Sequence, residues 1–157
     1  ELPAMTLQPN CYSRMFNGCT SLTTAPALPV TTLADSCYNN MFYGCTKLNA
    51  APALPATTLA NNCYDNMFNG CTSLYKLPTL PATTLADSCY KDMFRGCTKI
   101  MIATVKTGGY QTAYRVPKIG TGVTANSALA DMFTGTGGVF AGTPTINTTY
   151  YTENTIV

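Results

Sequence analysis

The pattern of apolar and polar residues along this chain repeats with a period of 26 residues. In the second copy, apolar side chains recur at Ala34, Cys37, Tyr38, Met41 and Cys45, spaced as i, i+3, i+4, i+7 and i+11. This spacing is typical of one face of an α-helix. We therefore expect each unit to contain a short helix whose inner face carries these residues.

The flanking residues predict where this helix begins and ends. Thr31 or Thr32, just after Pro29, is suited to an N-cap, and Gly44 lies where a helix commonly ends. The segment 45–52 then has the pattern of a short strand that ends at a proline. Each unit is thus predicted to be a helix, a glycine break, a strand and a proline-marked return.

The units are predicted to stack on one another, since self-similarity at such a period indicates repeats that bury their apolar faces against their neighbours. We expect residues 1–104 to hold four 26-residue repeats. In the segment 105–157, Met132, Phe133 and Gly135 match Met93, Phe94 and Gly96 of the fourth copy. This segment is therefore predicted to be an inserted hairpin followed by a degenerate fifth repeat that caps the stack.

The segment 41–48 reads MFYGCTKL, and the pattern M-F-x-G-C-T-x-L returns in every copy, with Ile100 in place of leucine in the last. It resembles the A-F-x-x-C-x-x-L core of BspA-like leucine-rich repeats, found in bacterial, phage and some protozoan cell-surface proteins. The resemblance implies an α/β fold, a leucine-rich-repeat solenoid with parallel strands on one face, short helices on the other and a β-rich C-terminal cap. The longer period, the second cysteine and the A-P-A-L-P return depart from that pattern.

A comparison of the four copies separates packed positions from variable ones. Two adjacent positions of the predicted strand vary freely, and they hold Thr23-Thr24, Asn49-Ala50, Tyr75-Lys76 and Met101-Ile102. In leucine-rich repeats these positions point to the concave face, and an exposed apolar cluster there indicates a binding role. The alternative is that exposed positions vary because nothing constrains them. The predicted ligand-binding residues are Asn49, Tyr75, Lys76, Lys99, Met101 and Ile102.

Eight cysteines recur as C-x7-C in the four copies. Bridges within a repeat, bridges between repeats and unpaired buried thiols are all compatible with this pattern. The resemblance favours free thiols that line the core. The predicted structural residues are Cys11, Cys19, Cys37, Cys45, Cys63, Cys71, Cys89 and Cys97, together with Phe16, Phe42, Phe68 and Phe94.

Composition argues against several classes of function. The chain has no histidine, so the usual catalytic triads and zinc ligand spacings are absent from its sequence. No cofactor motif or metal-ligand spacing is present, and we expect no catalysis, cofactor or metal. A net charge of +2 with 10% charged residues gives no electrostatic case for binding nucleic acid. No apolar run reaches membrane-spanning length, so we expect no membrane insertion.

These observations predict a non-catalytic recognition or adhesion module of a bacterial cell-surface or phage protein. It would lie outside the cell, at the cell surface or on a virion, and bind a protein or glycan of a host or neighbouring cell through the strand face. The alternative is a structural spacer that presents another domain. Because Leu2-Pro3 corresponds to Leu28-Pro29, we also expect an upstream part of the same protein to be missing. A natural start with a partner covering that face is the other interpretation.

Overall fold

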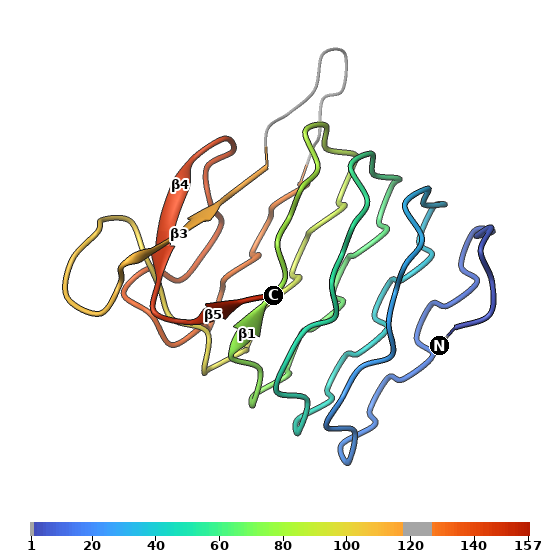
Figure 1. Cartoon of the computed structure of the whole chain (residues 1–157), viewed down its shortest axis with the longest axis horizontal. Coiled ribbons are helices and arrows are strands. Elements are labelled where there is room, and N and C mark those ends of the chain that lie inside the picture. Colours follow the sequence, from blue (N-terminus) through green and yellow to red (C-terminus); the bar gives the residue numbers. More distant parts are fainter. Residues whose placement is uncertain (1, 118–126) are drawn as a thin grey trace.

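A computed structural model describes residues 2–117 and 127–157 of the chain. Figure 1 shows a row of similar coils lying side by side, with the N-terminus at one end and the C-terminal segment packed against the other. We refer to residues 2–27, 28–53, 54–79 and 80–104 as coils 1 to 4, and to residues 127–136 as the terminal coil. Each coil corresponds to one copy of the repeated sequence.

The described residues contain no helix and only five short strands. The predicted α/β leucine-rich-repeat solenoid, with helices on one side of each unit and parallel strands on the other, is therefore wrong. The N-cap prediction for Thr31 or Thr32 fails with it, because no helix follows; Thr32 instead forms a parallel bridge with Thr58 of the next coil. The strands are β1 (Lys76–Leu77), β2 (Ile102–Ala103), β3 (Thr112–Arg115), β4 (Thr149–Thr152) and β5 (Thr155–Ile156).

In place of the helix, each coil has a segment of consecutive turns. Along this segment, the backbone N–H groups donate alternately to the next coil and within their own coil. In coil 1, every second N–H donates to a carbonyl of coil 2, as from Tyr12 to Cys37 at 3.0 Å and from Phe16 to Met41 at 2.9 Å. The intervening N–H groups donate within their own coil to the carbonyl three residues earlier, as from Met15 to Tyr12 at 3.3 Å. Coils 2 and 3 repeat this scheme towards their next neighbours. The backbone is thus satisfied half by local turns and half by the adjacent coil.

Residues with positive φ explain why the chain makes turns rather than a helix. In coil 2 they are Ser36, Asn40 and Gly44, at φ values of 55°, 53° and 69°, so every fourth residue is left-handed. Asn, Asp and Gly tolerate this conformation best, and it interrupts a right-handed helix. The apolar residues accordingly recur in pairs every four residues, a spacing that over a short segment resembles the helical one.

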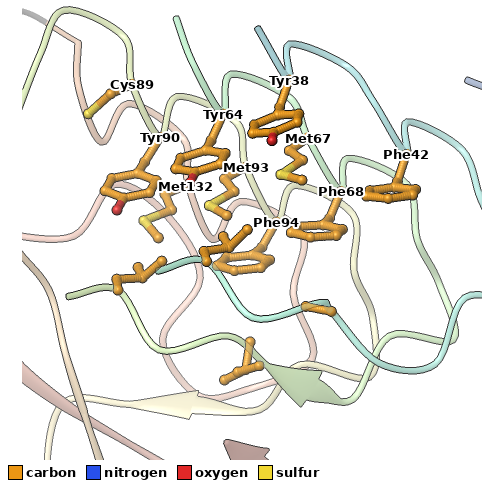
Figure 2. Packing of buried hydrophobic residues seen from close by; sticks show 14 of the residues in the cluster. Tyr38, Phe42, Tyr64, Met67, Phe68, Cys89, Tyr90, Met93, Phe94 and Met132 are labelled. Atoms are coloured by element: carbon orange, nitrogen blue, oxygen red, sulfur yellow. The ribbon is translucent and has the colours of Figure 1, made fainter. Parts of the chain in front are cut away.

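The apolar pairs of successive coils stack in columns along the row. The rings of Phe42 and Phe68 lie 5.6 Å apart with an interplanar angle of 4°, and those of Tyr38 and Tyr64 lie 5.9 Å apart. Figure 2 shows both columns beside the buried methionines. Offset stacking at such distances is favourable for aromatic rings. The column of phenylalanines continues from Phe94 to Phe133 of the terminal coil, at 5.8 Å.

The C-terminal segment closes one end of the row with two small sheets. In one sheet, β4 pairs antiparallel with both β2 and β3; in the other, β5 pairs in parallel with β1. The terminal coil accepts hydrogen bonds from coil 4, as Ala128 does from Tyr90 at 2.9 Å. The division at residue 104 stays a prediction, and part of its second region, residues 118–126, lies outside the described residues.

Candidate binding surface

Three of the predicted ligand-binding residues lie together where coils 2 and 3 meet. The carbonyl of Asn49 accepts the N–H groups of Tyr75 and Lys76, at 3.1 and 3.2 Å. Ala50 and Lys76 form a parallel bridge, which holds the two variable pairs in register. The side chain of Asn49 is exposed, that of Tyr75 is 40% exposed, and that of Lys76 is half-buried. Together these three side chains, which we call the coil 2–3 surface, form an accessible polar and aromatic patch.

Lys76 interacts with the ring of Tyr75 on this surface. Its Nζ atom lies 5.8 Å from the centroid of the ring, within the range of a cation–π contact. Such a contact at an exposed site contributes about 0.5–1 kcal/mol and restricts both side chains. The ring is therefore partly preorganised in an accessible position, where coils 1 and 2 carry Thr23 and Asn49.

The predicted residues of coil 4 are covered by the C-terminal segment. Ile102 is fully buried in β2 and pairs with Thr152 of β4, which removes it from the surface. Met101 is half-buried; its N–H donates to Asn154 Oδ1 at 2.7 Å, and its carbonyl accepts the Thr152 hydroxyl at 2.7 Å. Lys99 remains exposed, although its carbonyl accepts a hydrogen bond from Asn154 Nδ2. The expected continuous row of variable pairs therefore ends at coil 3.

Strand β5 borders the coil 2–3 surface on the side of coil 4. Thr155 is the register partner of Lys76, and the N–H of Val157 donates to the carbonyl of Leu77 at 2.8 Å. Figure 1 shows β5 alongside β1, near the C-terminus. Thr155, which is exposed, thus belongs to this surface and was missed by sequence reasoning. No local signal identifies it, because the pairing joins residues far apart in the chain.

A groove at the proline-marked returns of coils 1 and 2 is a second concave feature that the sequence did not indicate. It has a volume of about 430 Å³ and is lined by alanine, proline and leucine side chains, including Pro26, Pro52 and Pro55. Pro26 and Pro52 follow the variable pairs of coils 1 and 2 by two positions, and Pro55 opens coil 3. The groove offers apolar contact but no ionisable group.

The predicted structural cysteines occupy two columns in the core. All eight thiols are free; those of coils 2 to 4 are buried, while Cys11 and Cys19 of coil 1 are exposed. Burial raises the pKa of Cys37 and Cys45 to about 11 and that of Cys71 to about 12. The Cys71 thiol also donates to the carbonyl of Phe42 at 3.1 Å. Thiols held in the protonated form are poor nucleophiles, so the buried thiols of coils 2 to 4 contribute to packing.

The predicted structural phenylalanines follow the same trend along the row. Phe42, Phe68 and Phe94 are fully buried, whereas Phe16 of coil 1 is half-buried. The change in exposure occurs at coil 1, which among the described residues packs against coil 2 on one side and against no coil on the other. Burial in this core therefore depends on stacking rather than on the fold of an individual coil.

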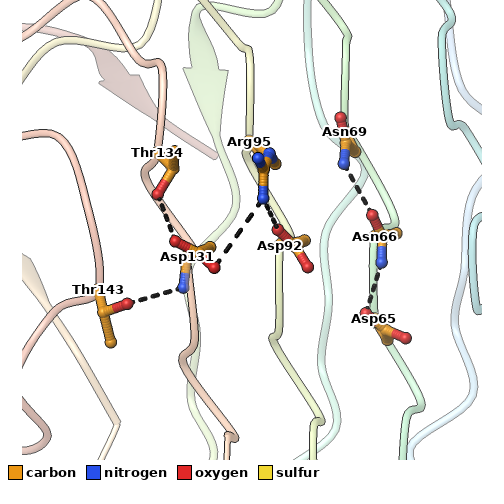
Figure 3. A network of polar contacts seen from close by, with 8 residues as sticks. All are labelled: Asp65, Asn66, Asn69, Asp92, Arg95, Asp131, Thr134 and Thr143. Atoms are coloured by element: carbon orange, nitrogen blue, oxygen red, sulfur yellow. Dashed lines mark hydrogen bonds and ion pairs between the residues drawn. The ribbon is translucent and has the colours of Figure 1, made fainter.

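Polar residues on the turn segments form two groups of contacts, drawn in Figure 3. Within coil 3, Asn69 donates to Asn66 and Asn66 donates to Asp65. Arg95 pairs with Asp92 of its own coil at 3.0 Å and with Asp131 of the terminal coil at 3.9 Å. Partial burial raises the pKa of the Asp65 carboxyl above its ordinary value. In the described part of the chain, no group of three His, Cys, Asp or Glu residues is arranged to hold a metal ion. These contacts stabilise the turns and, at Arg95, join coil 4 to the terminal coil.

No family model, curated protein or solved structure matches this chain. The predicted assignment to BspA-like leucine-rich repeats is therefore wrong, because the described coils lack the helices that those repeats contain. No matching relative supports that family or a role in adhesion. The described residues contain no helix that is long and apolar enough to cross a bilayer.

Proposed function

We propose that this chain is a non-catalytic recognition module, which binds a protein or glycan. The contact is made by the coil 2–3 surface, with Thr155 and Lys99 at its border. The observation that carries the proposal is the partly exposed ring of Tyr75, held by Lys76 beside Asn49 on the neighbouring coil. Tyrosine on a rigid backbone is well suited to a binding surface, because it supplies a large contact area at low entropic cost.

The roles of the side chains follow from their chemistry. Tyr75 provides an aromatic face for an apolar side chain or a sugar ring. Lys76 and Lys99 provide positive charge, and Asn49 both donates and accepts hydrogen bonds. The stacked coils below hold these groups at fixed spacing, so little ordering is required when a partner binds.

A matched pair of tyrosine variants tests this proposal. Tyr75 and Tyr43 are similarly exposed, at 40% and 41%, but Tyr43 lies on the turn segment of coil 2. The parent chain is first screened against extracellular-matrix proteins, glycans and whole bacterial cells. For any partner found, Tyr75→Ser is expected to weaken binding about tenfold or more, as at other interface hot spots. Tyr43→Ser is expected to leave it unchanged.

The other outcomes discriminate between alternatives. Equal binding by both variants and the parent would move the site away from the coil 2–3 surface, and the proline-lined groove would be tested next. No binding by the parent to any member of the panel would favour the structural spacer.

A further inference from the structure

The outer face of coil 1 is less covered than the same face of the other coils. Met15 is 48% exposed, whereas Met41, Met67 and Met93 are fully buried. Cys11 and Cys19 are exposed, whereas the six equivalent cysteines of coils 2 to 4 have no exposed area. The same residue types thus occupy the same positions, but in coil 1 they pack against a neighbouring coil on one side only. We call this surface, formed by Cys11, Met15, Phe16 and Cys19, the N-terminal face.

The backbone of the N-terminal face presents only acceptors. In coils 2 and 3, five alternate carbonyls accept N–H groups from the preceding coil, as Cys37 does from Tyr12. The equivalent carbonyls of coil 1 are those of Pro9, Cys11, Ser13, Met15 and Asn17. None of them accepts a backbone hydrogen bond from the described residues. A partner must therefore bring a matching row of N–H donors, since a row of open carbonyls behaves like the unpaired edge of a sheet.

The thiol of Cys19 adds a donor at one defined position. Its equivalents Cys45, Cys71 and Cys97 each donate to the phenylalanine carbonyl of the preceding coil, at 3.0–3.1 Å. A partner that continues the register would place such a carbonyl against Cys19. The aromatic columns end here as well, at Tyr12 and Phe16, whose rings stack on Tyr38 and Phe42 at 6.0 and 5.5 Å.

A second copy of this chain does not fit the N-terminal face. Two such faces placed against each other would oppose acceptor to acceptor. At the opposite end of the row, two central donors of the terminal coil are already used, because the N–H of Phe133 donates to Gly142 and that of Asp131 donates to the Thr143 hydroxyl, and this interrupts the row of donors. Neither end of a second copy therefore offers a free row of donors.

We propose that the N-terminal face binds a further coil of the same 26-residue type, supplied by another polypeptide segment. That coil presents five alternating N–H groups, a tyrosine and a phenylalanine in stacking register, and a carbonyl for the Cys19 thiol. This inference goes beyond the proposed function, because it concerns the end of the row and not its side. The partner is identified by the spacing of the N–H donors that the open carbonyls of the N-terminal face require.

The experiment inserts a copy of residues 28–53 between Glu1 and Leu2, with serine at both cysteine positions of the copy. Rates of maleimide labelling at Cys11 and Cys19 are measured under native conditions by mass spectrometry. Stacking of the inserted coil is expected to slow both rates about tenfold or more, because labelling then requires local opening. The control insertion also carries serine at the positions of Tyr38, Met41 and Phe42, and it is expected to leave the rates as they are in the parent.

Two results would overturn the proposal. One is unchanged labelling of Cys11 and Cys19 while Cys45 and Cys71 stay protected, both in this variant and in a second variant with two inserted copies. The second variant gives the new coil a neighbour of its own, and protection there alone still supports the proposal. The other is protection of both thiols in the unmodified chain at high concentration, together with a dimer in sedimentation, which would assign the face to a second copy.

Discussion

At the scale of single residues, the coils depend on side chains that tolerate left-handed backbone. The positions with positive φ recur at every fourth residue of the turn segments, and a glycine occupies the last of them in each coil. At Gly70, φ is 74°, and an added Cβ would meet the backbone of Gly44 at 3.7 Å, an ordinary contact distance. The requirement for glycine there is therefore one of backbone conformation more than of space.

We expect Gly70→Ala to lower the free energy of unfolding by about 1–2 kcal/mol, the cost of placing an L-residue in this conformation. Urea denaturation followed by circular dichroism measures the change. Thr72→Ala, an exposed substitution two residues away, is the control and is expected to have a small effect. A Gly70→Ala chain as stable as the control would show that the turn relaxes without strain.

The buried thiols make stability sensitive to alkaline pH. Burial raises the pKa of Cys37 and Cys45 from 9.0 to about 11, and that of Cys89 to about 12. Between pH 9 and these values the unfolded chain loses thiol protons that the folded chain keeps, so stability falls as pH rises. Below pH 8 these groups are protonated in both states and contribute no pH dependence.

We therefore expect the urea midpoint to be constant from pH 7 to 8 and to fall steeply from pH 9 to 11. Each buried thiol contributes a slope of up to about 1.4 kcal/mol per pH unit in this window. Replacing Cys37 and Cys45 by alanine is expected to reduce the slope relative to the parent chain. Equal slopes in the variant and the parent would contradict this account.

At the scale of elements, the C-terminal segment binds coils 3 and 4 through short strands and one buried amide. Asn154 is 9% exposed; its Oδ1 accepts the N–H of Met101 and its Nδ2 donates to the carbonyl of Lys99. Strand β5, directly after it, pairs with β1 of coil 3. A single residue thus connects the two sheets of the segment.

Asn154→Ala is expected to lower the free energy of unfolding by about 1–3 kcal/mol, because it removes the hydrogen bonds to the N–H of Met101 and the carbonyl of Lys99. The local effect is measured by hydrogen exchange of residues 99–103 and 152–157, which is expected to accelerate. Glu153→Ala, at the exposed neighbouring position, serves as the control. Exchange equally slow in both variants would mean that β5 holds the segment without this amide.

The elements also show what sequence could and could not predict. Residues assigned to the inner stripe, such as Cys37 and Met41, are fully buried, because pairs of apolar residues every four positions also satisfy a helical spacing. The prediction of a helix was wrong. Ser36 and Asn40 adopt a left-handed backbone conformation that interrupts a helix, and the spacing of apolar residues does not reveal that conformation. The pairing of β5 with β1 was equally hidden, because it joins residues 79 positions apart, as in Lys76 and Thr155.

The sequence also predicted part of the candidate site. Asn49 and Tyr75 are exposed, as their variation among the copies suggested. Ile102 varies in the same way but is fully buried, because β4 of the C-terminal segment pairs with β2 of coil 4, whereas the side chains of Asn49 and Tyr75 stay exposed. A comparison of the four repeats therefore identifies positions whose side chains do not pack between neighbouring coils. It does not show which of these positions are buried by the C-terminal segment.

At the scale of the whole molecule, equivalent coils form a row in which each contacts its neighbours through the same hydrogen bonds. Asn10 donates to Asp35, and Ser36 donates to Asn61 at the equivalent position of the next pair. Stability in such an array is approximately a sum of nearest-neighbour contributions. Coil 2 is therefore replaceable by coil 3 as the neighbour of coil 1.

Deletion of residues 28–53 is expected to leave a folded, less stable chain, because Ala27 then joins Leu54 at an equivalent register position. Protection of Cys71 and Cys97 from maleimide reports whether the remaining core is intact. Deletion of residues 28–40, half a unit, breaks the register of coil 2 and is expected to expose Cys71, which packs against that coil. Exposure in the first deletion as well would show that coil 2 contributes something its copies lack.

The alternation of hydrogen bonds in the turn segments also has a mechanical consequence. Because the bonds between coils all join one coil to the next, a force applied along the row loads the interfaces in series, and the weakest one opens first. Each coil that detaches releases 26 residues, on the order of 90 Å of extended chain. The C-terminal segment forms strand pairs with both coil 3 and coil 4. We therefore expect the coils to detach one at a time from the N-terminal end, and coils 3 and 4 to unfold last.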